Sequence, residues 1–148
     1  VNLRKFFYLA SGSYEGARSV ATLSEKKDLL SDIEDPLSLG AWCSEDDLDF
    51  YTKEFERSGF RGPLNYYRNH DLTWELTAGA PKEIQQPAMF AAGDRDGVIA
   101  LARDALEKMP SFVKDLRVNK LIPGIGHWTQ QEAPDEVNRI LLNFLASL

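Results

Sequence analysis

A histidine and an aspartate stand in two tight turns where they could together carry out proton transfer. His127 lies in a Gly-His-Trp turn after an apolar segment, and Asp96 lies in the turn Gly93-Asp-Arg-Asp-Gly97 after an earlier apolar segment. A neutral imidazole can take a proton from water, and a carboxylate on its other ring nitrogen fixes the tautomer and stabilises the imidazolium. We predict that His127 is a general base and that Asp96 orients it.

Two alternatives to this pair stay open on the sequence. Asp94 stands two residues before Asp96 in the same turn and is a second candidate for the acid. Both aspartates could also do no more than form an Asx-type turn after a strand, since aspartate side chains commonly bond to nearby backbone N–H groups.

The sequence contains no nucleophile in the kind of turn where such a pair could activate it. A nucleophile elbow needs the attacking residue at the centre of a Gly-x-Nuc-x-Gly turn. The two frames with this spacing place Tyr14 and Arg95 at their centres, and neither attacks as serine or a carboxylate would. The chain therefore supplies a base and its orienting acid with nothing to activate.

Helical signals dominate the first half of the chain. Apolar spacing indicates a helix over residues 3–10, a capping-box pattern at Ser44 begins a second that Gly59 ends, and Pro63 suits the first position of a third. Trp74 and Leu76 suggest further packing after it. Residues 12–41 form a long connection that we expect to hold at most one short helical turn.

The second half alternates strands and helices. Residues 88–92 are predicted to form a strand buried on both faces, residues 98–109 a helix stopped by Pro110, and residues 116–122 a second strand. Pro134 opens a last helix with a clean apolar face. This is an α/β pattern with right-handed crossovers. Because two parallel strands need neighbours, we expect the edge of a larger doubly wound sheet.

Composition excludes several classes of protein. The net charge of −6 leaves no basic face for nucleic acid, and no run of 18 apolar residues could span a bilayer. Cys43 is the single cysteine, so no internal disulfide forms, and we expect a soluble, cytoplasmic protein. Because the first residue is Val1 rather than Met, we expect a longer gene product or a processing event.

The tyrosine-rich segment 60–69, Phe-Arg-Gly-Pro-Leu-Asn-Tyr-Tyr-Arg-Asn, is the most discriminating motif. By composition alone it would be aromatic packing. It nevertheless resembles the cap-domain motif of α/β-hydrolase-fold epoxide hydrolases, which commonly reads Leu-Asn-Trp-Tyr-Arg-Asn, and residues 126–134 resemble the histidine segment of the same family. The resemblance implies that residues 1–80 are the later part of a helical cap domain and residues 81–148 the last strands and helices of the core domain.

The resemblance also implies a mechanism without metal or organic cofactor. An aspartate opens an epoxide to form an alkyl ester, cap tyrosines protonate the epoxide oxygen, and a histidine–acid pair activates water to release a vicinal diol. Carried over by position, Tyr67 is one cap tyrosine, Asp96 the acid and His127 the base. Tyr66 stands where tryptophan is more usual and would line the pocket, and Trp128 would line the site or pack beneath it.

The family's nucleophilic aspartate, oxyanion-hole sequence and other cap tyrosine have no counterpart in this chain. We therefore expect the chain alone to be inactive, and to work with the N-terminal half of the same enzyme or with an oligomeric mate. Two alternatives stay open: another α/β-hydrolase chemistry, such as a haloalkane dehalogenase or an esterase, and a non-catalytic fragment or binding module.

Overall fold

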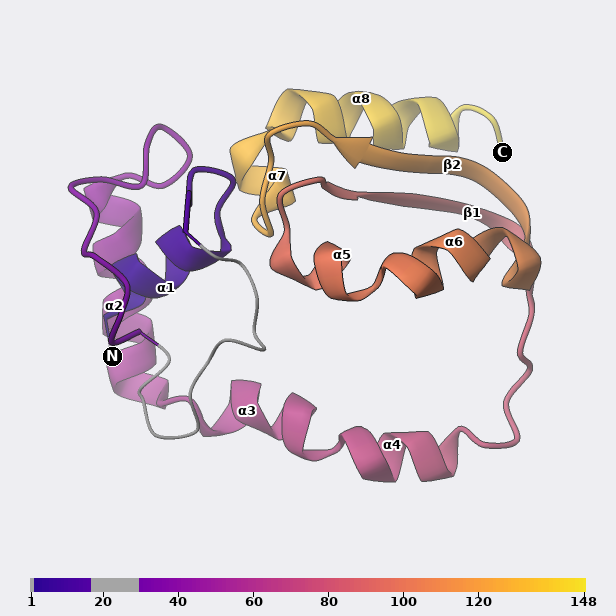
Figure 1. Cartoon of the computed structure of the whole chain (residues 1–148), viewed down its shortest axis with the longest axis horizontal. Helices are drawn as coiled ribbons and strands as arrows, with labels where there is room; N and C mark the ends of the chain where they lie inside the picture. Colours follow the sequence, from indigo (N-terminus) through magenta and orange to yellow (C-terminus); the bar gives the residue numbers. More distant parts are fainter. Residues whose placement is uncertain (1, 17–29) are drawn as a thin grey trace.

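The computed structural model describes residues 2–16 and 30–148, which surround a two-stranded parallel sheet. Strand β1 (Ile84–Gly93) pairs with β2 (Val113–Ile122). Helices α5 (Gly97–Leu101) and α6 (Arg103–Phe112) lie on one face of the sheet and α8 (Pro134–Leu145) on the other (Figure 1). Because the strands are parallel, their carboxyl ends meet at one edge, beside the short helix α7 (Thr129–Glu132).

The predicted helices of the first half are confirmed, and their ends follow from the capping residues. Helix α1 (Leu3–Ala10) begins where the side chain of Asn2 accepts the backbone N–H of Lys5. Helix α2 (Glu45–Ser58) begins at a complete capping box between Ser44 and Asp47 and ends at Gly59, whose φ of 65° favours glycine.

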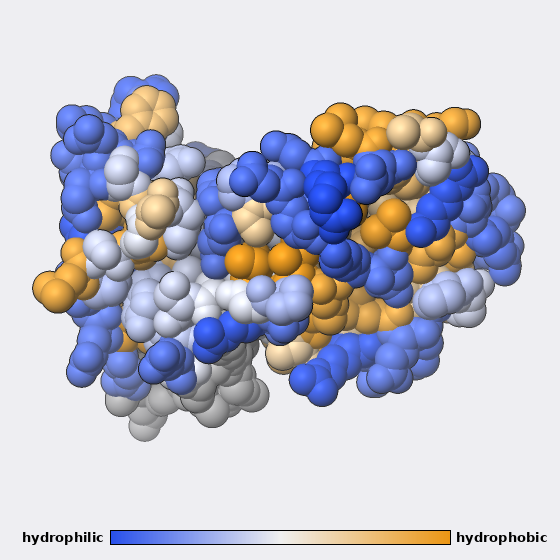
Figure 2. Space-filling view, turned by 90° about the horizontal axis from the view of Figure 1, so that it is seen from above, coloured by the Kyte–Doolittle hydropathy of each residue, from blue (hydrophilic) through white to orange (hydrophobic). Residues whose placement is uncertain are grey.

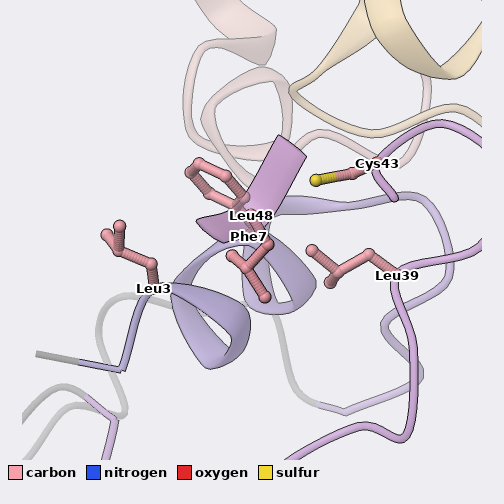
Figure 3. Close-up of a cluster of buried hydrophobic side chains, with 5 residues drawn as sticks. All are labelled: Leu3, Phe7, Leu39, Cys43 and Leu48. Atoms are coloured by element: carbon pink, nitrogen blue, oxygen red, sulfur yellow. The ribbon is translucent and has the colours of Figure 1, made fainter. Parts of the chain in front are cut away.

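A buried apolar cluster joins α1, α2 and the segment before α2. Its members are Leu3, Phe7, Leu39, Cys43 and Leu48 (Figure 3). The guanidinium of Arg4 on α1 also bonds both carboxylate oxygens of Glu45 at 2.7 and 2.5 Å. Trp128, from the turn after β2, packs against this cluster and so links the helical part to the carboxyl ends of the strands, where α1 approaches α7 (Figure 1).

Pro134 opens α8 as expected, but the other two prolines expected to bound helices lie inside them. Helix α3 (Arg61–Arg68) begins two residues before Pro63, and α6 continues through Pro110 to Phe112. A proline in the first turn loses no helical hydrogen bond, and one near the last residue removes only one. The predicted helix over 98–109 is in fact two, because the chain turns at Ala102 between α5 and α6.

Several apolar surfaces that the sequence predicted to be buried are exposed. In the predicted strand 88–92, residues 88–91 are half-buried and only Ala92 is fully buried, so burial on both faces is incomplete; β1 also begins earlier, with exposed residues 84–87. Trp74 on α4 (His70–Leu76) is 78% exposed, and Leu145, on the predicted core face of α8, is 51% exposed. Figure 2 shows apolar patches among polar residues on the half that carries the sheet. In the predicted connection 12–41, residues 17–29 lie outside the described residues, and 30–41 contain only turns and bends.

Helix α8 is held to β2 by a small ion cluster that makes stability depend on pH. Arg139 and Lys120 bond the Glu136 carboxylate and lower its pKa from 4.5 to about 2. Since the folded-state pKa is below the unfolded value, the cluster stabilises the fold above pH 4.5, and this stabilisation is lost as the pH falls towards 2.

We therefore expect Glu136→Gln to lower Tm at pH 7, and the difference from the parent chain to shrink between pH 4.5 and about 2. Thermal unfolding followed by circular dichroism across that range measures it. Glu107→Gln, which removes the same charge from an exposed site on α6, is the control. An equal loss of Tm at pH 7 in both variants would contradict the ion cluster's role.

Candidate active site

The turns that follow β1 and β2 bring Asp96 and His127 together. The Nδ1 atom of His127 lies 2.9 Å from Oδ2 of Asp96. The Asp96 side chain is 10% exposed, and the His127 side chain is 49% exposed. The pair thus stands at the carboxyl edge of the sheet, where open α/β sheets place their ligands.

Asp96 is held from both sides, whereas Asp94 has a different partner. The Oδ1 atom of Asp96 accepts the backbone N–H of Val98 at 2.8 Å and caps α5, which leaves Oδ2 for the imidazole. The carboxylate of Asp94 instead accepts the N–H of Gly124 at 2.7 Å, tying the first turn to the second. The two aspartates of this turn therefore make different contacts: Asp94 binds the second turn, and Asp96 binds His127.

Glycine allows the two turns to pack backbone against backbone. The N–H of Arg95 donates to the carbonyl of Ile125 at 2.9 Å. A Cβ atom added at Gly93 would stand 2.1 Å from that same carbonyl oxygen, so no other residue fits without a shift of the chain. This close packing sets the separation of the acid and the base.

The geometry fixes what the imidazole can do. An ionised carboxylate only accepts hydrogen bonds, so the Nδ1 atom of His127 carries the proton and Nε2 keeps its lone pair. Nε2 can therefore accept a proton from water.

The His127 turn is fastened to the end of α1 by contacts that the sequence did not reveal. The N–H of His127 donates to the carbonyl of Ala10 at 2.8 Å, and the indole N–H of Trp128 donates to the carbonyl of Phe7 at 2.9 Å. Glu132 accepts N–H groups from both sides of the histidine. The pattern Thr129-x-x-Glu132 is a capping signal that could have drawn attention to this glutamate.

An aromatic pocket of about 380 Å³ adjoins this turn. Trp128 lines it, together with Trp42, Tyr51 and Phe60 from the helical part. The indole N–H of Trp42 is buried and has no hydrogen-bond partner in the part of the chain that the structure describes. The pocket is lined mainly by aromatic and aliphatic side chains, with Asp47 and Gln131 among its polar lining residues. Mostly apolar walls with a few polar groups are typical of sites for small ligands.

The two predicted tyrosines lie apart from this pair. Tyr67 and Tyr66 are on α3 and are 70% and 82% exposed. The Tyr67 ring packs against His70 with centroids 5.7 Å apart. No hydrogen bond joins either tyrosine to Asp96 or His127 among the described residues. The structure thus pairs Asp96 with His127 and places both tyrosines on the exposed helix α3.

Within residues 2–16 and 30–148, no three side chains of His, Cys, Asp or Glu gather as a metal ion would need. None of the helices described there is both long and apolar enough to cross a membrane.

Comparison with known proteins gives one consistent answer. The chain is 45% identical over 114 residues to epoxide hydrolase B of Mycobacterium tuberculosis, and 44% identical over 117 residues to epoxide hydrolase A of the same organism. The solved structure of an epoxide hydrolase from an endophytic Streptomyces matches 97% of the chain with a TM-score of 0.88 at 39% identity. The chain is homologous to the α/β-hydrolase-fold epoxide hydrolases. No protein-family model matches it.

The homology covers most of this chain but only part of each epoxide hydrolase. The match spans 76% of the chain and 32% of epoxide hydrolase B, and 78% and 36% for epoxide hydrolase A. The epoxide hydrolase A structure from Mycobacterium thermoresistibile matches 97% of the chain and 44% of its own length, with a TM-score of 0.79 at 33% identity. The predicted partial α/β-hydrolase fold is therefore confirmed.

Proposed function

We propose that this chain is the part of an epoxide hydrolase that supplies the water-activating pair, and that it acts with polypeptide carrying the nucleophile. The 2.9 Å contact between His127 Nδ1 and Asp96 Oδ2 at the carboxyl edge of the sheet carries the proposal. The homology to epoxide hydrolases supports the choice of substrate class. Residues 1–80 would be cap and residues 81–148 core. We use "complete enzyme" for this chain together with the nucleophile-bearing polypeptide, which would be the N-terminal half or an oligomeric mate.

In the first step a carboxylate of the complementary polypeptide attacks an epoxide carbon. A carbon–oxygen bond forms to the carboxylate, the epoxide carbon–oxygen bond breaks, and Tyr67 donates a proton to the released oxygen. The product is a hydroxyalkyl ester. The exposure of Tyr67 on α3 supports this role, because this helix is free to face the polypeptide that carries the nucleophile.

In the second step His127 acts on water. Nε2 takes a proton as the water oxygen attacks the ester carbonyl, and Asp96 stabilises the imidazolium that results. The ester bond then breaks, and the imidazolium returns its proton to the leaving oxygen, which releases the diol. The carboxylic acid left behind gives up its proton, which restores the Tyr67 phenol and leaves the carboxylate ionised. The aromatic pocket beside Trp128 is suited to the apolar part of the epoxide.

Turnover of styrene oxide by the complete enzyme tests the proposal. We expect diol from the complete enzyme and none from the chain alone. Tyr67→Phe should lower kcat/KM for the epoxide about 10²-fold, because one donor to the developing oxyanion is lost. Tyr66→Phe is the matched control, since it removes the neighbouring hydroxyl from the same helix.

The other α/β-hydrolase chemistries are separated by the same assay. Release of halide from a haloalkane, or hydrolysis of an ester, with no diol from the epoxide would reject the proposed reaction. Equal kcat/KM for Tyr67→Phe and the parent enzyme would reject the role of Tyr67. Absence of all three activities would favour a non-catalytic chain.

A further inference from the structure

The carboxylate of Glu132 accepts hydrogen bonds from the backbone on both sides of His127 without contacting its ring. The Oε2 atom of Glu132 accepts the backbone N–H of Gly126 at 3.1 Å and of Gly12 at 2.7 Å, and Oε1 accepts the N–H of Trp128 at 3.2 Å. Gly126 and Trp128 are the residues immediately before and after His127. Three donors from two distant segments therefore converge on one half-buried side chain.

The surrounding backbone leaves room for this carboxylate and little else. A Cβ atom at Gly12 would stand 2.8 Å from Oε2 of Glu132 and 2.2 Å from the carbonyl oxygen of Gly124. A Cβ atom at Gly126 would stand 2.3 Å from the backbone nitrogen of Gly12. Both glycines thus permit the close approach of the α1 end to the His127 turn, and Glu132 occupies the point where their N–H groups meet.

We infer that Glu132 is a positioning residue for His127: its carboxylate holds the backbone on both sides of the histidine and so keeps Nδ1 on Asp96 and Nε2 towards the reacting water. Hydrogen bonds from backbone N–H groups to an ionised carboxylate are among the stronger ones in proteins. If these three bonds are released, the His127 N–H bond to Ala10 and the Trp128 indole N–H bond to Phe7 still tie the turn to α1, and the Arg95 N–H bond to Ile125 still ties it to the turn after β1. The inference about catalysis rests on the proposed function, whereas the inference about geometry does not.

The geometric part is tested on the chain by nitrogen-15 NMR of the histidine rings. In the parent chain we expect Nδ1 of His127 to show a strongly hydrogen-bonded proton. Glu132→Gln keeps the size of the side chain but turns one acceptor into a donor that faces N–H groups, so we expect that signal to weaken or split. Glu132→Asp, which retains the charge on a shorter stem, should restore part of it. An unchanged His127 signal in Glu132→Gln and in Glu132→Ala would overturn the inference.

The catalytic part is tested in the complete enzyme. A misplaced base slows hydrolysis of the ester while leaving its formation intact, so Glu132→Gln should lower kcat roughly 100-fold, the scale of an ångström-sized misplacement, and accumulate the ester seen by mass spectrometry. Ile140→Val, a buried change on α8, controls for lost stability, and we expect it to accumulate no ester.

The outcomes separate the two inferences. A kcat that falls only in proportion to the folded fraction, with no accumulated ester, would overturn the positioning role. A parent enzyme that forms no diol would reject the proposed function, and the ring signals of His127 in the Glu132 variants would still decide whether the glutamate positions the histidine.

Discussion

Replacement of His127 by alanine should convert the complete enzyme from a catalyst into a reagent that reacts once. The attack on the epoxide does not use the imidazole, whereas the attack of water on the ester does. We expect one equivalent of epoxide to be consumed quickly and steady turnover to fall by about 10²–10⁴-fold, the usual contribution of a general base. Intact-mass measurement should show the nucleophile-bearing polypeptide heavier by the mass of the epoxide.

His70 provides the matched control, because it is the other histidine of the chain. It lies on α4 against the Tyr67 ring, away from the Asp96 carboxylate. His70→Ala should accumulate no ester. Turnover by His127→Ala within a few-fold of the parent enzyme would show that another group activates water.

The contact between Asp96 and His127 could be predicted because local sequence signals indicate it. A glycine-rich turn directly after an apolar strand places its side chains at the carboxyl edge of a sheet, and adjacent parallel strands bring two such turns together. The spacing therefore indicated that Asp96 and His127 would meet, and they lie 2.9 Å apart. Asp96, rather than Asp94, contacts His127 because the two carboxylates accept different N–H groups. Asp96 accepts the N–H of Val98, and Asp94 accepts the N–H of Gly124.

Contacts between distant segments could not be predicted in the same way. The bond from Gly12 to Glu132 joins residues 120 positions apart, and neither residue shows a periodic pattern that indicates the other. The exposure of Trp74 on α4 was not predicted either, because an apolar residue shows that it needs cover but not which segment covers it. Helix boundaries at Pro63 and Pro110 failed for a simpler reason, since proline is tolerated in terminal turns as well as beside them.

Asp96→Asn should nearly abolish turnover while leaving the fold intact. The asparagine Oδ1 can still accept the Val98 N–H and cap α5, so we expect little change in Tm. Its Nδ2 group, however, donates where the carboxylate accepted. It therefore selects the imidazole with a bare Nδ1 and a proton on Nε2, the atom that must receive the proton from water.

The loss in kcat should be about 10⁴-fold, as when the orienting aspartate of a serine protease is replaced by asparagine. Nitrogen-15 NMR should show the proton of His127 moved from Nδ1 to Nε2, and the ester should accumulate as it does in His127→Ala. Asp94→Asn is the control: it alters the contact with Gly124 but leaves Asp96 on the imidazole, so the tautomer should not change. Retention of the Nδ1 proton in Asp96→Asn would show that the backbone of the His127 turn, and not the carboxylate, selects the reactive tautomer.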